Sequence, residues 1–148
     1  MAILIAPAAP SVRFATKTLT FTGADTLGLV NTNASLFTVT GDVVVFLISP
    51  FCTSTLTGAA STVQLGVLNG LTIFIGVSTA TLIATGQYWV NTTPASTDNA
   101  IAFPAALKEI AITDSIVCRS LTQTTTGGTL RFDVFWQPLS SDGNLVAA

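Results

Sequence analysis

Short hydrophobic runs alternate with polar residues along most of this chain, and turn-forming residues separate the runs. The runs are rich in Thr, Val, Ile, Leu and Phe, while Gly, Asn, Pro and Ser lie between them. β-Branched and aromatic residues favour strands, and closely spaced turns are typical of all-β domains. The pattern predicts strands at residues 18–22, 36–40, 43–49, 62–68, 72–76, 81–84, 87–91, 115–121 and 128–137.

Glycine-containing segments mark the predicted turns. The segments "TGD" at 40–42 and "LNGL" at 68–71 predict tight hairpins, and "TTTGGT" at 124–129 predicts a third turn. Glycine and asparagine supply the positive φ angles that two-residue hairpin loops require. The one helical segment that we expect is a turn or two at "PAALKEIA", 104–111, where proline takes the first position.

The strand count defines the expected fold. About eight or nine short strands in one small domain predict a single β-sandwich of jelly-roll or Greek-key type, with a closed barrel as the alternative. We expect the sandwich to span residues 18–138, after an extended N-terminal arm at 1–17 and before a C-terminal tail at 139–148. A chain of 148 residues is long enough for one domain with a sizeable core.

The last predicted strand, "RFDVFWQP", has aromatic residues on both faces. Because side chains alternate with period two, Phe132, Val134 and Trp136 share one face and Phe135 lies on the other. Three large apolar groups on one face favour the interior, where their burial contributes on the order of 6 kcal/mol. Phe135 lies beside charged residues, so we expect it to meet a partner.

Further apolar side chains have no predicted place in the core. The segment at 92–107, "TTPASTDNAIAFPAAL", has no alternation, and loops of this length usually serve a function or contact a partner. The tail returns to apolar residues after Pro138 and a turn, and the N-terminus is apolar as well. The predicted interface residues are Ile3, Leu4, Ile5, Phe103, Phe135, Leu145 and Val146.

The composition favours association and argues against two classes of partner. Charged residues make up 8% of the chain, whereas a soluble domain carries roughly 25%. A surface with so few charges repels its neighbours weakly. The five basic residues are scattered and the net charge is −2, so we expect no nucleic-acid partner. The longest apolar run, "VVVFLI" at 43–48, is too short to span a membrane.

The cysteines and the N-terminus indicate the compartment. Cys52 and Cys118 are the only cysteines, and we predict two buried free thiols, with a disulfide between them as the alternative. The opening "MAILIAPAAP" lacks the positive region of a signal peptide. We therefore expect synthesis in a reducing cytoplasm.

Catalytic patterns are weak throughout. The chain has no histidine, which removes Ser-His and Cys-His pairs and the commonest metal ligand. "GVSTA" at 76–80 nearly matches a nucleophile elbow, but no His follows it, so Ser78 is interpreted as a turn or strand serine. The aspartates mostly adjoin turn residues and are expected to bond to backbone. We predict no enzyme activity, no cofactor and no metal.

The aromatic residues leave two interpretations open. Tyr88, Trp89, Phe132, Phe135 and Trp136 could form a sugar-stacking platform on one face of the sandwich. Their alternative role, which we favour, is to fill the core and a subunit interface.

Three stretches resemble a known group of proteins. These are "LTFTGADTLGLVNTNASLFTVTGDVVV" at 19–45, "TGQYWVNTTP" at 85–94 and "FWQPLSSDGNLV" at 135–146. Together they resemble small virion structural proteins of tailed bacteriophages, similar to head decoration, or cement, proteins. The resemblance implies a β-sandwich that sits on the lattice of the major capsid protein, often as a homotrimer.

Two functions follow as expectations. The first is a non-enzymatic virion component, assembled in the host cytoplasm, that stabilises the phage head lattice as a decoration protein. The alternative is a β-sandwich module of a phage tail or fibre that binds a receptor or a carbohydrate. An exposed cluster of aromatic residues would favour the second function, and burial of those residues between subunits would favour the first.

Overall fold

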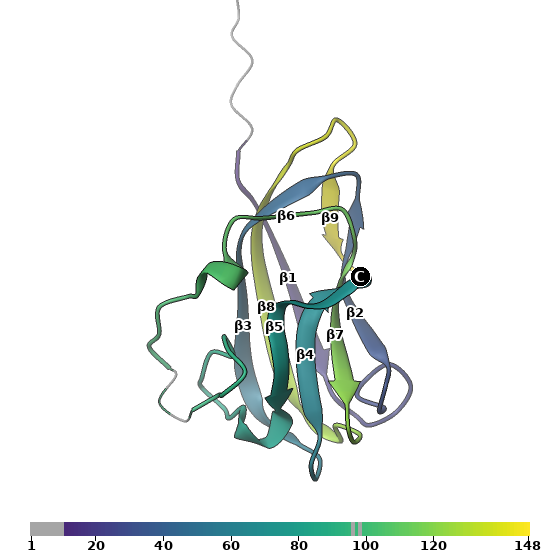
Figure 1. The fold of residues 1–148 in the computed structure, drawn as a ribbon, viewed down its shortest axis with the longest axis vertical. Helices are drawn as coiled ribbons and strands as arrows, with labels where there is room; N and C mark the ends of the chain where they lie inside the picture. The colour runs from purple at the N-terminus through teal and green to yellow at the C-terminus, as the bar shows by residue number, and fades with distance from the viewer. Residues whose placement is uncertain (1–10, 96, 98) are drawn as a thin grey trace, which may run out of the picture.

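Two antiparallel β-sheets packed face to face form the protein (Figure 1). The structure, a computed structural model, describes residues 11–95, 97 and 99–148. The described strands are β1 (Arg13–Thr20), β2 (Asn33–Thr40), β3 (Val43–Thr57), β4 (Thr62–Val67), β5 (Gly70–Thr79), β6 (Ile110–Ile112), β7 (Ile116–Leu121), β8 (Gly127–Pro138) and β9 (Asn144–Ala147). The all-β fold predicted from the hydrophobic pattern is confirmed.

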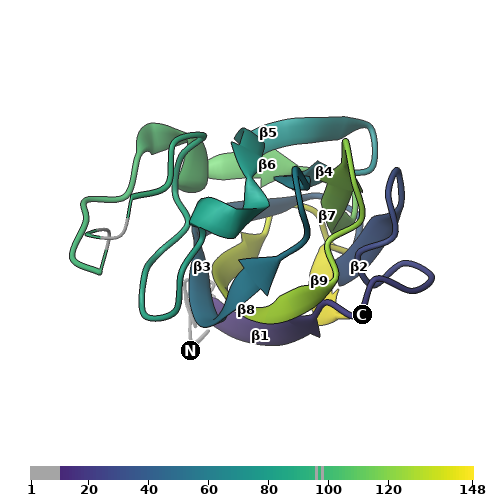
Figure 2. The same cartoon turned by 90° about the horizontal axis from the view of Figure 1, so that it is seen from below.

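The order of the strands is that of a jelly roll. One sheet has the order β1-β8-β3-β6 and the other the order β5-β4-β7-β2-β9, and Figure 2 shows β1 and β8 in one layer and β4 and β5 in the other. Among the first eight strands, β1 pairs with β8, β2 with β7, β3 with β6, and β4 with β5. This pairing of the first strand with the last, the second with the one before the last, and so on inward is what a long hairpin produces when it is rolled into a sandwich.

The three predicted turns have different outcomes. The "LNGL" hairpin is confirmed, since Val67 pairs with Gly70 across it. The hairpin expected at 40–42 is wrong, because β2 and β3 belong to different sheets. Gly41, with φ of 60°, reverses the chain there but passes it from one layer to the other. The turn at 124–129 also leads from one sheet to the other.

The long connection between β5 and β6 closes one side of the sandwich. The strands predicted at 81–84 and 87–91 are wrong: this stretch holds the 3₁₀ turn η1 (Ala80–Leu82) and a single β-bridge at Tyr88. Its apolar side chains, Ile83 and Trp89 among them, are buried in the core, and its backbone lies beside β3. The stretch forms backbone hydrogen bonds with β3, from Cys52 N–H to Gln87 and from Trp89 N–H to Pro50, but it does not form a continuous strand.

Helical structure is as sparse as predicted. The expected helix at 104–111 is the single 3₁₀ turn η2 (Ala105–Leu107), and Leu107 at its end is buried. Among the described residues, no helix is long and apolar enough to cross a membrane.

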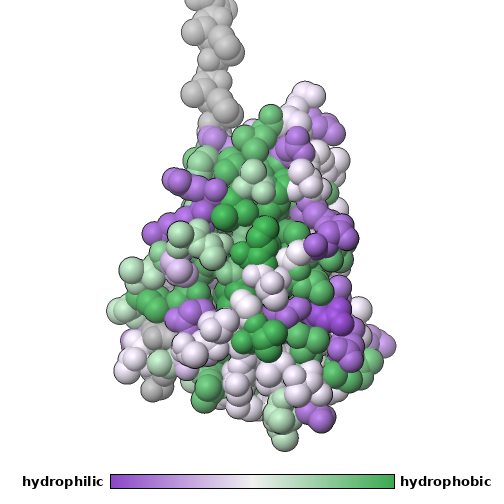
Figure 3. Space-filling model, in the orientation of Figure 1, coloured by the Kyte–Doolittle hydropathy of each residue, from purple (hydrophilic) through white to green (hydrophobic). Residues whose placement is uncertain are grey.

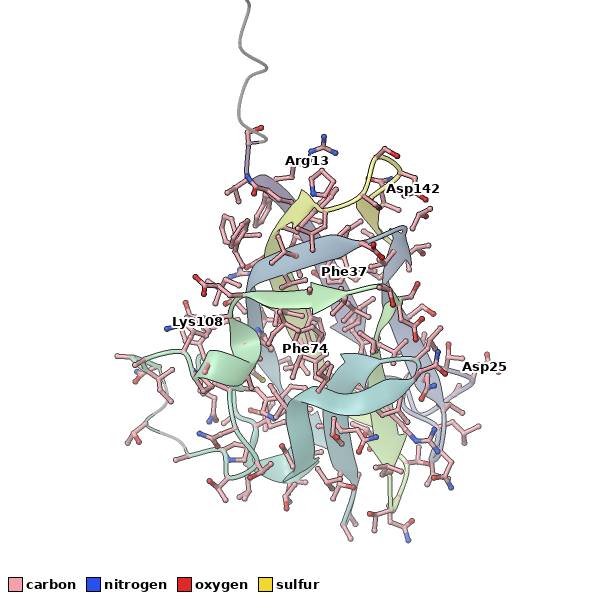
Figure 4. The ribbon with its side chains drawn as sticks, turned by 45° about the horizontal axis from the view of Figure 1, so that its top comes forward. Arg13, Asp25, Phe37, Phe74, Lys108 and Asp142 are labelled. Carbon is pink, nitrogen blue, oxygen red and sulfur yellow. The ribbon has the colours of Figure 1, made fainter. Side chains whose placement is uncertain are left out.

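The core lies between the two sheets. Figure 4 shows Phe37 and Phe74 among the side chains in the middle of the molecule, and both are buried. Phe132, Val134 and Trp136 on β8 are buried in the same cluster, which confirms the face assigned to them.

The boundaries of the sandwich differ from those expected. Strand β1 begins at Arg13, so residues 13–17 belong to the sandwich and not to an arm. Beyond the turn at 139–143, β9 pairs with β2, and Val39 faces Leu145 in this pairing. The tail therefore forms the edge of the five-stranded sheet, because its alternating residues find an unpaired edge there.

Candidate interaction surface

An apolar row crosses three strands on the outer face of the four-stranded sheet. The register places Phe14 of β1 and Leu47 of β3 on either side of Phe135 of β8. The rings of Phe14 and Phe135 lie 5.2 Å apart at 54°. Phe14 is 57% exposed and Phe135 39%. Because the neighbours of Phe135 on β8 point into the core, this row points to the solvent.

Further along β3, a second aromatic group lies on the same face. Phe51 forms a β-bridge with Tyr88 and packs edge-on against it, with ring centroids 5.0 Å apart. Tyr88 in turn contacts Phe103, at 5.5 Å and 75°. These rings are partly buried, and they bring the loop before η2 against the sheet.

Two charged residues join the aromatic groups. Arg131 Nε lies 2.9 Å from Asp133 Oδ2, and Thr16 Oγ1 donates to Asp133 Oδ1 at 2.7 Å. The Arg131 guanidinium also lies over the Phe51 ring, 5.2 Å from its centroid. Register pairs Arg131 with Thr18 of β1 and with Phe51 of β3. We call this surface the aromatic face: Phe14, Leu47, Phe51, Tyr88, Phe103, Arg131, Asp133 and Phe135.

The aromatic face contains two of the predicted interface residues. Phe135 is exposed on it, whereas Phe103 is half-buried against Tyr88 of its own chain. Phe103 thus anchors its loop to the sandwich, and it is less exposed than we expected. No partner is present in the structure, so the expected contact of Phe135 with a partner stays a prediction.

The remaining interface candidates lie elsewhere. The expectation for Leu145 is wrong, because it is 2% exposed and belongs to the core. Its neighbour Val146 points outward from β9 and is 48% exposed. Ile3, Leu4 and Ile5 lie outside the described residues.

The five-stranded sheet presents a second apolar surface. Figure 3 shows hydrophobic residues down the middle of the side on which β4, β5 and β6 face the viewer in Figure 1. Ile73 and Val77 of the edge strand β5 are exposed. Arg119 lies on the central strand β7 and donates to Asn33 Oδ1 at 3.4 Å, while its buried Nε finds no acceptor among the described residues.

The proposed sugar-stacking platform does not form from the residues suggested for it. Trp89, Phe132 and Trp136 are buried in the core, so only Tyr88 and Phe135 of that set reach the surface. Phe14 was missed at the sequence level, although the alternation in "RFATKTLT" is the signal that could have found it. Phe14 lies beside Phe135 because β1 pairs with β8, and the residue pattern within either strand does not show which strands pair.

The polar candidates have structural roles. Ser78 is buried, accepts the indole N–H of Trp89 and lies within hydrogen-bond distance of two carbonyl oxygens. Asp114 accepts bonds from the backbone and the side-chain amide of Asn69 in the β4–β5 turn. Asp142 accepts a bond from Ser140 in the turn before β9. Among the described residues, no three His, Cys, Asp or Glu side chains are grouped as metal ligands.

Both cysteines are free and buried, as predicted, and they belong to opposite sheets. Burial raises the pKa of the Cys118 thiol to about 12. Burial also raises the pKa of Cys52, against hydrogen bonds to the backbone of Ser54 and Leu56 that lower it. Because a thiolate is the reactive form, neither environment activates a nucleophile.

Two cavities lie away from the aromatic face. One cavity, of about 390 Å³, opens between the β4–β5 turn and β6. Asp114 lines it, but the carboxylate of Asp114 already accepts a hydrogen bond from the side-chain amide of Asn69. The other, about 350 Å³, lies beside β1 and β2, where Lys17 donates to the carbonyl oxygen of Ala148. Neither cavity gathers groups for acid–base or nucleophilic chemistry.

Comparison with protein-family models, with curated proteins and with solved structures found no match to this chain.

Proposed function

We propose that this protein is a non-enzymatic structural component of a bacteriophage virion, which decorates the head lattice of the major capsid protein as a homo-oligomer. The observation that carries the proposal is the aromatic face, where the exposed rings of Phe14 and Phe135 contact each other at 54° beside Leu47. The larger aromatic cluster that would have favoured a sugar-binding module is not exposed, because Trp89, Phe132 and Trp136 are buried in the core. Rings of this kind are typical anchors of protein interfaces.

Two further points support the proposal. Jelly rolls occur in viral capsid and lectin domains, which favours a binding or assembly function by analogy of fold alone. The low charge of the chain and its resemblance to decoration proteins favour assembly over the lectin role. Stabilising a lattice requires surfaces, and it does not require a reactive cleft.

Binding to capsids tests the function directly. Capsids assembled without this protein are mixed with it and sedimented, and the bound fraction is measured across concentrations. We expect saturable binding, which Phe14→Ser and Phe135→Ser weaken at least about tenfold, because they break the homo-oligomer whose copies bind the lattice together. Leu82→Ser is the matched control, because Leu82 is about as exposed as Phe14 but lies on η1, outside the aromatic face. Wild-type protein that stays in the supernatant would contradict the proposal.

The same surface also favours a second candidate, a carbohydrate- or receptor-binding module. Phe14 and Phe135 are exposed next to Asp133, and rings beside hydrogen-bonding groups suit a sugar. A glycan array separates the two functions. Binding of one glycan that Phe135→Ala abolishes, without any binding to capsids, would support this candidate over the first.

A further inference from the structure

The charges of the aromatic face form a single dipole in its middle. Arg131 and Asp133 project from the same side of β8 and contact each other, and their side chains are 44% and 18% exposed. The residues beside them on β1 and β3 are uncharged: Thr16 and Ser49 flank Asp133, while Thr18 and Phe51 flank Arg131. The face therefore presents one positive and one negative group, side by side.

Apolar groups extend along the strands on both sides of this dipole. Phe14, Phe135 and Leu47 lie beyond Asp133, and Phe51, Tyr88 and Phe103 lie at the level of Arg131 and to its side. A partner that covers these rings also removes water from the charges. Charges that lose water need opposite charges nearby, because their electrostatic interaction strengthens as the local dielectric constant falls.

We infer that the aromatic face binds the same face of a second copy of this chain. The two copies are related by a two-fold axis that lies in the interface, perpendicular to β8, and passes over β8 between Arg131 and Asp133. The axis makes the two β8 strands antiparallel, so that Arg131 of each copy meets Asp133 of the partner subunit. The Arg131–Asp133 dipole is best matched by a dipole of opposite direction. A second copy related by a two-fold axis provides this opposite dipole, because the symmetry reverses the order of the two charges. A surface with one sign of charge would leave one of the two groups unmatched.

Two features of the chain favour this partner. With a net charge of only −2, two copies of the chain repel each other weakly. The outer face is a β-sheet surface, and β-sheets can pack face to face with interdigitated side chains. This inference rests on the proposed function in one respect, since it names the partner of the same surface.

Charge reversal provides the test. Native mass spectrometry measures the mass of the wild-type protein, of Arg131→Glu, of Asp133→Lys and of an equimolar mixture of the two variants, one of them isotope-labelled. We expect the wild-type protein to be a dimer and each variant alone to be a monomer. In a dimer of either variant, like charges would face each other at both of the symmetric contacts between positions 131 and 133. In the mixture the introduced glutamate of one copy faces the introduced lysine of the other, so a mixed pair forms with a dissociation constant within about tenfold of wild type.

The controls separate folding from association. Asp25→Lys makes the same change of charge on the exposed loop between β1 and β2, and it should leave the two-copy mass unchanged. Melting curves check that each variant is folded. Wild-type protein of one-copy mass at every soluble concentration, a three-copy mass, or a mixture that remains unpaired would overturn the inference.

The two proposals can fail separately. Variants that lose pairing but bind capsids like wild type would leave the virion function standing and show that capsid binding does not need the pair. Two-copy protein that never binds capsids would leave the pairing standing and remove the virion function.

Discussion

Trp89 donates its indole N–H to the hydroxyl oxygen of Ser78, 2.9 Å away, inside the core. Trp89 belongs to the long connection between β5 and β6, and Ser78 belongs to β5. The Ser78 hydroxyl also lies 3.2 Å from the carbonyl oxygen of Asn91, further along the same connection. One buried serine thus joins the connection to the edge of the five-stranded sheet.

We predict that Ser78→Ala lowers the free energy of unfolding by about 1–3 kcal/mol, because it leaves the buried indole N–H without an acceptor. Thr79→Ala, at the exposed neighbouring position, should change it by less than about 0.5 kcal/mol. Urea unfolding followed by tryptophan fluorescence measures both. Equal stabilities of the two variants would show that the bond does not hold the connection in place.

The C-terminal strand gives a second prediction, which replaces the expected role of the tail in binding. Leu145 is buried in the core and Val146 is exposed on the other side of β9. We expect Leu145→Ala to lower the free energy of unfolding by about 2–5 kcal/mol, since it leaves a cavity. Val146→Ala should have an effect of less than about 0.5 kcal/mol. Thermal unfolding of the two variants decides the matter, and a stable Leu145→Ala protein would contradict a structural role for β9.

Local patterns predicted the parts of this fold that depend on local geometry. Side-chain alternation along β8 placed Phe132, Val134 and Trp136 inside and Phe135 outside, because the period of a strand is two whatever its partners are. The glycine turn at 40–42 predicted a chain reversal correctly, but a reversal does not say which sheet receives the next strand. The tail failed for a similar reason, since the burial of Leu145 depends on reaching the edge of β2.

The candidate site was less predictable than the fold. Phe135 could be assigned to an outer face, but Phe14 lies 121 residues earlier in the chain and meets it only through the register of β1 and β8. The segments at 81–84 and 87–91 were wrongly predicted as strands because β-branched and aromatic residues suit a strand and also suit a core-filling loop, whereas the loop at 92–107 was predicted as such. Nonlocal pairing decided both cases.

Gly66 allows the chain to approach itself closely on the outer side of β4. A Cβ atom at this position would lie 2.2 Å from the carbonyl oxygen of Gly70 and 2.3 Å from the carbonyl carbon of Leu71. Both are backbone atoms, which cannot swing aside. We therefore predict that Gly66→Ala destabilises the protein by about 1–3 kcal/mol or more.

Gly70 is the matched control for this prediction. It has no positive φ, and the nearest atom to a new Cβ would be a methyl carbon of Val67 at 3.4 Å. Gly70→Ala should leave the free energy of unfolding unchanged or raise it by about 0.4–1 kcal/mol, because alanine lowers the conformational entropy of the unfolded chain. Chemical denaturation of both variants should give effects of opposite sign or clearly different size; similar losses would mean that the close approach is not what matters.

The last prediction concerns alkaline pH and the thiol of Cys118. Burial raises its pKa from the ordinary value of 9.0 to about 12. Above pH 9 the thiol of the unfolded chain loses its proton while that of the folded chain keeps it, so unfolding releases a proton. The contribution of the neutral thiol to stability is complete below pH 9 and falls by about 1.4 kcal/mol per pH unit as the pH rises toward 12.

Cys118→Ala removes this dependence and keeps the other titrating groups. Between neutral pH and about pH 10.5, the wild-type protein should lose roughly 2 kcal/mol more of its free energy of unfolding than the variant loses. At neutral pH the variant is the less stable of the two, since it lacks buried atoms, so the gap between the proteins narrows as the pH rises. Urea unfolding at both pH values measures the gap. If the gap is constant, the Cys118 thiol ionises as readily in the folded chain as in the unfolded one, and its burial in β7 does not affect its titration.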